Sequence, residues 1–215
     1  MKVPLPLLIS LSAGAVVCAV GAMIMLDRHR SAVPETSAAD LDLNIPEFDL
    51  IDHNGFPTDE SVLDGRLTLA AFIFTNCPGL CPLMTSTMAQ AQDRLRDTDL
   101  RFASFSLDAE RDTPEALRDF AAAHSADLTN WSMLTGNTET SRRLIRDGLR
   151  LIVEDEPENQ VPTADGSTMA NVLHPTRMIL VGPDRRVLGF YSVSNVAELD
   201  RLEADVRSFF ADRGT

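Results

Sequence analysis

Residues 67–82 read Leu-Thr-Leu-Ala-Ala-Phe-Ile-Phe-Thr-Asn-Cys-Pro-Gly-Leu-Cys-Pro, and this stretch decides the fold. The apolar run from Leu67 to Phe74 predicts a strand that is buried on both faces. It ends in Asn, Pro and Gly, after which an apolar helical pattern begins. Cys77 and Cys81 are therefore expected where a strand turns into a helix, whose N-terminal N–H groups favour a thiolate.

The spacing of the two cysteines indicates chemistry. Three intervening residues would place their Cβ atoms about 5–6 Å apart if the segment is helical. This separation suits a local disulfide, or two thiolates that share one soft metal ion. A purely structural disulfide is the alternative, but a link that closes so short a loop adds little stability.

Strand and helix patterns alternate on either side of this stretch. Apolar residues before Asn54-Gly55 predict a hairpin. Further strands are expected over 102–107, 131–134, 178–181 and 187–191. Helices are expected around 84–95, from Asp112-Thr113-Pro114 onward, over 138–148 and from about Asn195. In the last of these helices, Val196 is expected to face inward. The polar segment 155–170 is predicted to be a long loop. The order indicates one α/β domain, similar to a thioredoxin-like fold, with a central mixed sheet flanked by helices.

The N-terminal segment predicts a membrane anchor. Residues 3–26 carry no charged side chain and are long enough to cross a bilayer. We expect residues 1–30 to form an N-terminal transmembrane helix, 31–43 a linker and 44–215 the folded domain. A cleaved signal peptide is the alternative. The close cysteine pair favours an oxidising compartment, and hence a domain outside the cytoplasm.

The charge of the chain restricts its partners. The whole sequence has a net charge of −13, and without residues 1–30 it has 16 basic and 31 acidic residues, a net charge of −15. Nucleic-acid binding is excluded, because it requires a basic surface. An acidic surface attracts cations or a basic partner, although it also serves solubility.

Four histidines are present, of which one is a candidate metal ligand. His29, His53 and His124 are expected at the surface. His174 directly precedes Pro175 at the start of a predicted strand, and in this topology that strand begins beside the cysteine turn. Two Cys and one His suit copper, since thiolates favour Cu(I) and imidazole suits Cu(I) or Cu(II). Zinc is the alternative, although a structural zinc site normally has four protein ligands.

Five ordered motifs give the chain a family resemblance. They are Phe48-Asp49-Leu50 with Asn54-Gly55, Thr75…Cys77-Pro78…Cys81-Pro82, Leu107-Asp108-Ala109-Glu110-Arg111-Asp112-Thr113-Pro114-Glu115, Leu134-Thr135-Gly136, and His174 before a strand that ends in Gly182-Pro183-Asp184. Together they resemble the Sco/SenC family, the synthesis-of-cytochrome-oxidase proteins. The matches extend through most of residues 46–193.

The resemblance implies a membrane-anchored, thioredoxin-fold copper protein outside the cytoplasm, on the periplasmic side of a bacterial inner membrane or its equivalent. It implies copper ligands at Cys77, Cys81 and His174, and an acidic residue near the site at Asp108. It further implies a role in assembling the dinuclear copper centre of cytochrome c oxidase. The expected partners are a copper-accepting oxidase subunit and a copper donor or thiol reductant.

Two functions remain open on this evidence. A metallochaperone would pass copper to its acceptor, whereas a thiol–disulfide oxidoreductase would use Cys77 and Cys81 to reduce the target's cysteines. A peroxiredoxin-like peroxidase is disfavoured, because both cysteines lie in one turn. The chain departs from the family at Gly79, where Asp is usual, and this loss of a negative charge predicts more acidic thiols. Pro175 is expected to hold His174 toward the cysteines, and Met169 is a further candidate for transient metal contact.

Overall fold

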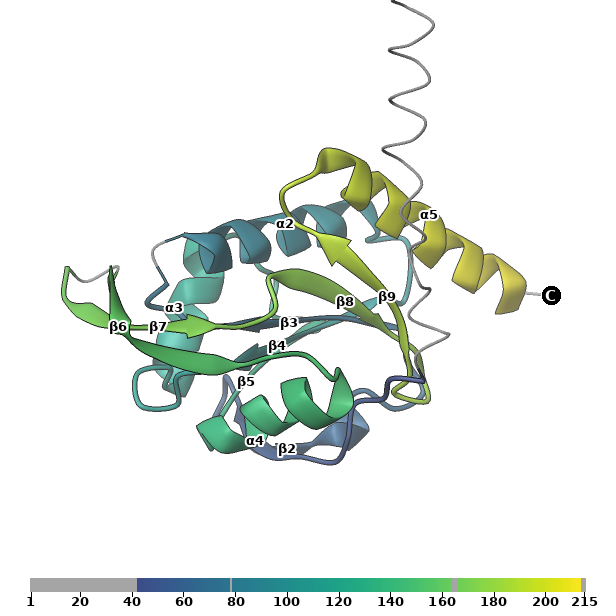
Figure 1. Ribbon diagram of the computed structural model, residues 1–215. Helices are drawn as coiled ribbons and strands as arrows, with labels where there is room; N and C mark the ends of the chain where they lie inside the picture. Colours follow the sequence, from purple (N-terminus) through teal and green to yellow (C-terminus); the bar gives the residue numbers. More distant parts are fainter. Residues whose placement is uncertain (1–41, 78, 164–165, 214–215) are drawn as a thin grey trace, which may run out of the picture. The chain divides into compact units, whose positions relative to one another are not determined.

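The computed structural model describes residues 42–77, 79–163 and 166–213. A seven-stranded mixed sheet in the order β2-β1-β5-β4-β3-β8-β9 forms its centre (Figure 1). The strands are β1 Asp49–Asp52, β2 Pro57–Asp59, β3 Thr68–Ile73, β4 Arg101–Ser106, β5 Trp131–Thr135, β8 Arg177–Val181 and β9 Val187–Ser192. The helices are η2 Glu60–Val62, α2 Leu80–Arg94, α3 Pro114–Ala123, α4 Thr138–Arg143, η3 Leu144–Gly148 and α5 Val196–Arg213. The predicted α/β class, with helices flanking a central mixed sheet, is confirmed.

The strands in the middle of the sheet position the cysteine turn and the residues that precede β8. Strand β3 runs parallel to β4, and β4 runs parallel to β5, whereas β8 is antiparallel to β3. All six residues of β3 are buried, as its continuous apolar run predicts. The carboxyl ends of the three parallel strands and the start of β8 therefore meet at the same end of the sheet.

Helices cover the two faces of the sheet (Figure 1). One apolar core contains the buried sides of α2, α3 and α5, and the other contains residues of β1 and η3. The predicted inward face of α2 is confirmed, because Met84, Met88 and Ala91 are fully buried. The inward orientation predicted for Val196 is wrong: its side chain is 73% exposed at the first position of α5, and burial begins one turn later at Leu199.

The loop predicted over residues 155–170 is wrong. Strands β6 Glu154–Pro162 and β7 Thr168–Leu173 pair in antiparallel fashion, with Asp155 opposite Val172. We call this two-stranded sheet the β6–β7 ribbon. Its polar sequence has no apolar alternation because β6 is mostly exposed, and backbone pairing rather than burial makes it a strand.

The predicted anchor lies outside the described residues, as does nearly all of the predicted linker. Leu43, at the end of that linker, is already buried in the core, and its carbonyl oxygen accepts a hydrogen bond from the Val187 N–H at 2.9 Å. In the part of the chain that the structure describes, no helix is long and apolar enough to cross a bilayer.

Candidate metal centre

The two cysteines lie in the turn between β3 and α2, as predicted. Cys77 is 8% exposed and its N–H donates to the Phe74 carbonyl oxygen at 3.3 Å. Cys81, in the first turn of α2, is fully buried. Both are free thiols. The buried strand and the apolar face of the helix thus present one thiol near the surface and keep the other beneath it.

The two thiols differ in acidity because each acts on the other. A hydrogen bond from the Cys81 thiol lowers the pKa of Cys77 to about 6, helped by the backbone N–H groups at the start of α2. The same interaction, together with burial, raises the pKa of Cys81. At neutral pH the pair therefore holds one thiolate, at Cys77, and one thiol proton, at Cys81.

A buried carboxylate anchors this turn, and sequence reasoning missed it. The helix start predicted at Asp112-Thr113-Pro114 is confirmed, and Thr113 is the cap, accepting from the Ala116 N–H at 3.2 Å. Asp112 is fully buried and accepts hydrogen bonds from the Thr75 N–H at 3.1 Å and the Thr75 hydroxyl at 2.6 Å, and also from the Ser106 hydroxyl. Burial raises its pKa. The sequence did contain a signal for this role of Asp112. Asp112 and Thr113 can both cap a helix that begins at Pro114, and a helix needs only one cap.

His174 lies at the same end of the sheet as the cysteines. Because Ala70 pairs with Ile179 in antiparallel register, the residues before β8 continue past the end of β3. The His174 ring accordingly packs edge-on against Phe74, with 5.7 Å between ring centroids. His174 is thus near the cysteine turn through its contact with Phe74, which lies three residues before Cys77.

The His174 ring is in a form that suits metal binding. Its Nδ1 lies 3.0 Å from the Pro175 carbonyl oxygen, which only accepts, so Nδ1 carries the proton and the Nε2 lone pair is available. Burial lowers the His174 pKa, which favours the neutral imidazole. Within residues 42–77, 79–163 and 166–213, however, no three His, Cys, Asp or Glu side chains lie close enough together to hold a metal ion.

Asp108 borders the same region. Its side chain accepts from Arg111 at 3.0 Å and is 9% exposed as a residue. It lines a pocket of about 460 Å³ together with Phe74, Arg142 and residues of the β6–β7 ribbon. The structure therefore places Asp108 beside Phe74 and the ribbon. Met169 lies in β7, and its side chain is outside the described part of the structure.

His53 is not the surface residue that the sequence suggested. It is 8% exposed, and its Nδ1 accepts from the Met133 N–H at 3.3 Å, so the ring fastens the β1–β2 hairpin to β5. Burial lowers its pKa. His124 is partly exposed, packs edge-on against Phe120 at the end of α3, and lies with its Nδ1 3.5 Å from the Ser86 hydroxyl of α2.

Comparison with known proteins agrees with this architecture. The SCO1 protein homolog of Bacillus subtilis (strain 168) is 33% identical over 172 residues, which cover 78% of this chain and 83% of the relative. The solved structure of BsSco, a member of the Sco family of cytochrome c oxidase assembly proteins, is 32% identical with a TM-score of 0.65, covering 78% and 94% of the two chains. Bradyrhizobium japonicum ScoI, solved with copper bound, shares the fold at 24% identity and a TM-score of 0.57, covering 77% and 98%.

The family model agrees in extent with the described domain. The model for SCO1/SenC matches residues 36–210, which include the cysteine turn, Asp112 and His174. The resemblance first suggested by the sequence motifs is confirmed: the chain belongs to the SCO1/SenC family.

Proposed function

We propose that this protein binds copper through Cys77, Cys81 and His174 and assists assembly of the dinuclear copper centre of cytochrome c oxidase. The observation that carries the proposal is the hydrogen-bonded cysteine pair at the start of α2, with an acidic Cys77. Family membership supports it, as do the description of BsSco as a cytochrome c oxidase assembly protein and the copper found in ScoI.

The donor set fits copper as a cargo ion. Cys77 supplies a thiolate at neutral pH, and metal binding would displace the proton from Cys81. His174 offers a neutral imidazole with Nε2 available. Soft sulfur donors with one imidazole are a set that copper accepts in either oxidation state.

His174 would complete the set by a local movement. It follows the end of β7, and residues 174–176 lie outside any strand before β8 begins. The Phe74 ring packs against His174, and the Phe74 carbonyl oxygen accepts from the Cys77 N–H. We propose that Pro175 limits how far this segment moves, and that Asp108 supports the site from its outer side.

The cellular setting belongs to the same proposal. Residues 1–30 would anchor the chain, 31–43 would link it, and the domain from residue 44 would lie outside the cytoplasm, where cysteine pairs cycle between thiol and disulfide. Its partners would be a copper-accepting oxidase subunit and either a copper donor or a thiol reductant.

Copper titration of the reduced full chain against a competing chelator tests the three-residue site. We expect one copper ion per chain. Affinity should fall by more than about 100-fold for Cys77→Ser and by at least about 10–100-fold for His174→Ala, since loss of a group that merely supports a ligand already costs a metal site that much. His124→Ala is the matched control and should bind as the wild type does. Equal affinities for His174→Ala and the wild type would remove His174 from the site.

The alternative function is thiol–disulfide exchange, which the unequal acidity of the two cysteines favours. The Cys77 thiolate would attack a target disulfide and release one target thiol. Cys81 would then attack the mixed disulfide, leaving a Cys77–Cys81 disulfide and the second target thiol. His174→Ala discriminates between the functions: this reduction should survive in the variant, whereas tight copper binding should not.

A further inference from the structure

We propose that the surface around the cysteine turn is a docking face for a protein partner with an apolar centre surrounded by basic residues. The proposal deepens the proposed function, since it states what kind of surface can approach Cys77. It rests on three features that meet at this end of the sheet: exposed leucines, unpaired carboxylates and a pocket.

Exposed leucines border the candidate centre on two sides. Leu80 and Leu83, in the first turn of α2, are each 45% exposed, and Leu80 follows Cys77 by three residues. Leu173, also 45% exposed, ends β7 directly before His174. Single exposed leucines are common, but leucines that flank one reactive turn from two elements form an apolar surface of the kind that binds proteins.

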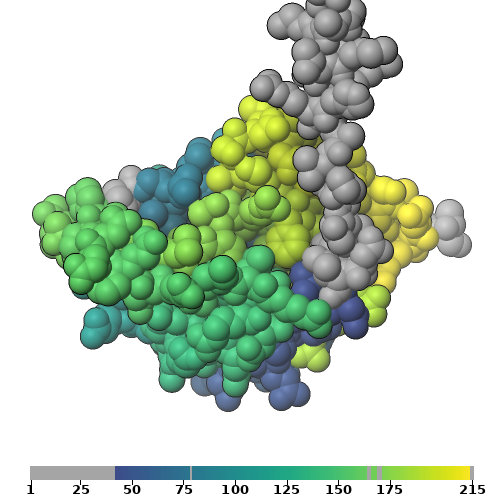
Figure 2. Space-filling model, in the orientation of Figure 1, coloured from purple at the N-terminus to yellow at the C-terminus, as the bar shows by residue number. Residues whose placement is uncertain are grey.

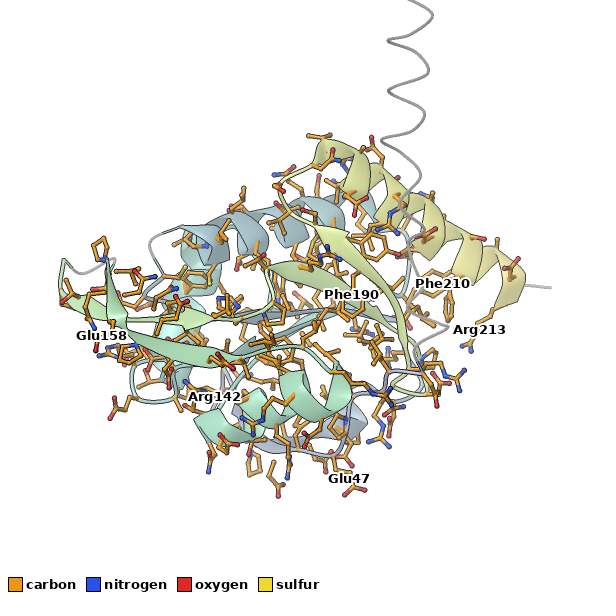
Figure 3. All side chains as sticks on the ribbon, in the orientation of Figure 1. Glu47, Arg142, Glu158, Phe190, Phe210 and Arg213 are labelled. Carbon is orange, nitrogen blue, oxygen red and sulfur yellow. The ribbon has the colours of Figure 1, made fainter. Side chains whose placement is uncertain are left out.

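Carboxylates on the β6–β7 ribbon lie beside these leucines. Glu154 pairs with Leu173 in the ribbon register, and Glu158 lies further out along the same strand (Figure 3). Within the described residues, Glu154, Glu156 and Glu158 have no ion pair, and β7 contributes no charged residue. Asp155 alone in this strand is paired, with Arg142 at 2.6 Å.

Several acidic residues elsewhere on the domain are paired with arginines. At the far end of α2 and on α5, ion pairs join Arg94 to Asp200 at 2.8 Å and Arg207 to Asp97 at 2.9 Å. Asp99, before β4, pairs with Arg66 at 3.2 Å. In the described part of the chain, the ribbon therefore presents three carboxylates without an ion pair next to the segment that carries His174, and these favour a basic partner over an acidic one.

The pocket beside Phe74 offers a place for one basic side chain. It has a volume of about 460 Å³ and is lined by three acids and two arginines. Arg111 pairs with Asp108 and Arg142 with Asp155, while Glu110 has no ion pair within the described residues. Figure 2 shows the ribbon, in green, projecting beside α2, in blue, at one edge of the molecule. A lysine or arginine from the partner would enter the pocket between the ribbon and residues 107–111.

Rates of thiol–disulfide exchange with model peptides test the docking face on the reduced full chain in nonionic detergent. The probes are short peptides closed by a disulfide, with leucine beside each cysteine, flanked either by lysines or by glutamates. Electrostatic attraction should make the lysine peptide react about tenfold faster at low salt. The ratio should approach one near 1 M salt, where the screening length is about 3 Å.

Matched variants distinguish the effect of the ribbon carboxylates on the rate ratio from the effect of the net charge of the chain. Glu154→Gln with Glu158→Gln should reduce the rate ratio about threefold. Asp93→Asn with Asp147→Asn changes net charge equally on exposed positions remote from the turn, and should leave the ratio unchanged. Leu83→Gln should slow the leucine peptide, whereas Phe56→Gln, at a residue 67% exposed in the distant hairpin, should not. Equal effects of the two double variants would overturn the proposal.

Failure of the proposed chemistry remains distinguishable from failure of docking. If neither peptide reacts, the cysteine turn is not a reactive dithiol and the alternative function of thiol–disulfide exchange is overturned, while the copper titration decides the metal site separately. Docking is then decided by NMR with serine in place of the peptide cysteines. Lysine-peptide shifts confined to Leu80, Leu83 and Leu173 would support the docking face, and shifts elsewhere or none would overturn it.

Discussion

The turn that carries Cys77 and Cys81 is built on buried structure, whereas the segment that carries His174 follows the exposed β6–β7 ribbon. Beneath the cysteines lie β3, the apolar face of α2 and the Asp112 hydrogen bonds. Around His174 the structure provides the contact with Phe74 and the bond to Pro175, at the end of a ribbon whose β6 strand is mostly exposed. One side of the candidate centre is therefore preorganised, and the other side is able to adjust.

This difference suits the proposed binding and release of a copper ion. A preorganised thiol pair loses little conformational entropy on binding, which supports affinity. A third ligand on an adjustable segment can be withdrawn at small cost, which supports transfer. Four experiments test this difference between the cysteine turn and the His174 segment, in order of decreasing effect.

Removing the Asp112 carboxylate should destabilise the domain most. Asp112→Ala leaves the Thr75 N–H and the Thr75 and Ser106 hydroxyls without their acceptor, at a cost of about 3 kcal/mol in the free energy of unfolding. Urea denaturation measures it. Asp155→Ala, which breaks an ion pair on the ribbon, should cost less than about 1 kcal/mol. Equal costs would show that the two sides are held equally firmly.

Removing the Cys81 thiol should raise the Cys77 pKa. The hydrogen bond from Cys81 is the largest cause of the low value of about 6, so Cys81→Ala should raise it by at least about one unit, equivalent to about 1.4 kcal/mol. The pH dependence of alkylation by iodoacetamide reports this pKa. An unchanged profile would mean that the N-terminus of α2, rather than Cys81, activates Cys77.

His53, which is buried between the β1–β2 hairpin and β5, should make the free energy of unfolding depend on pH. Its pKa is lowered by burial, so the unfolded chain binds a proton more readily. Its contribution to the free energy of unfolding is complete above the unfolded pKa of about 6.5 and is lost as the pH falls from there through the lower folded value. His53→Asn keeps an acceptor for the Met133 N–H but does not titrate, and should flatten unfolding curves measured between pH 5 and 7.5 by comparison with the wild type.

Restoring a charge beside the cysteines should have the smallest effect. A side chain at Gly79 would meet no atom within 4 Å, and φ there is negative, at −136°. Gly79→Asp should therefore fold normally and raise the Cys77 pKa by about half a unit through charge repulsion. Gly79→Asn is the uncharged control. If both variants change the alkylation profile alike, backbone geometry rather than charge sets the acidity.

Sequence reasoning succeeded where burial requires apolar residues to follow a regular pattern along the chain. The continuous apolar run of β3 and the recurrence of Met84 and Met88 on α2 record which faces are covered, and both elements were predicted. It failed for β6, whose backbone pairs with β7 while its side chains remain in solvent. It also failed for Asp112 and His53. The sequence around a polar residue in a turn does not show whether its hydrogen-bond partners are water molecules or residues of distant strands.

By itself, the sequence determined the α/β class, the cysteine turn at the end of the first central strand and the family, since each depends on local order along the chain. Only the tertiary structure decided that Asp112 supports that turn and that His174 packs against Phe74. It also decided that the thiols share one proton unequally. These facts depend on distances between residues far apart in sequence, which strand order and register set and no local pattern records.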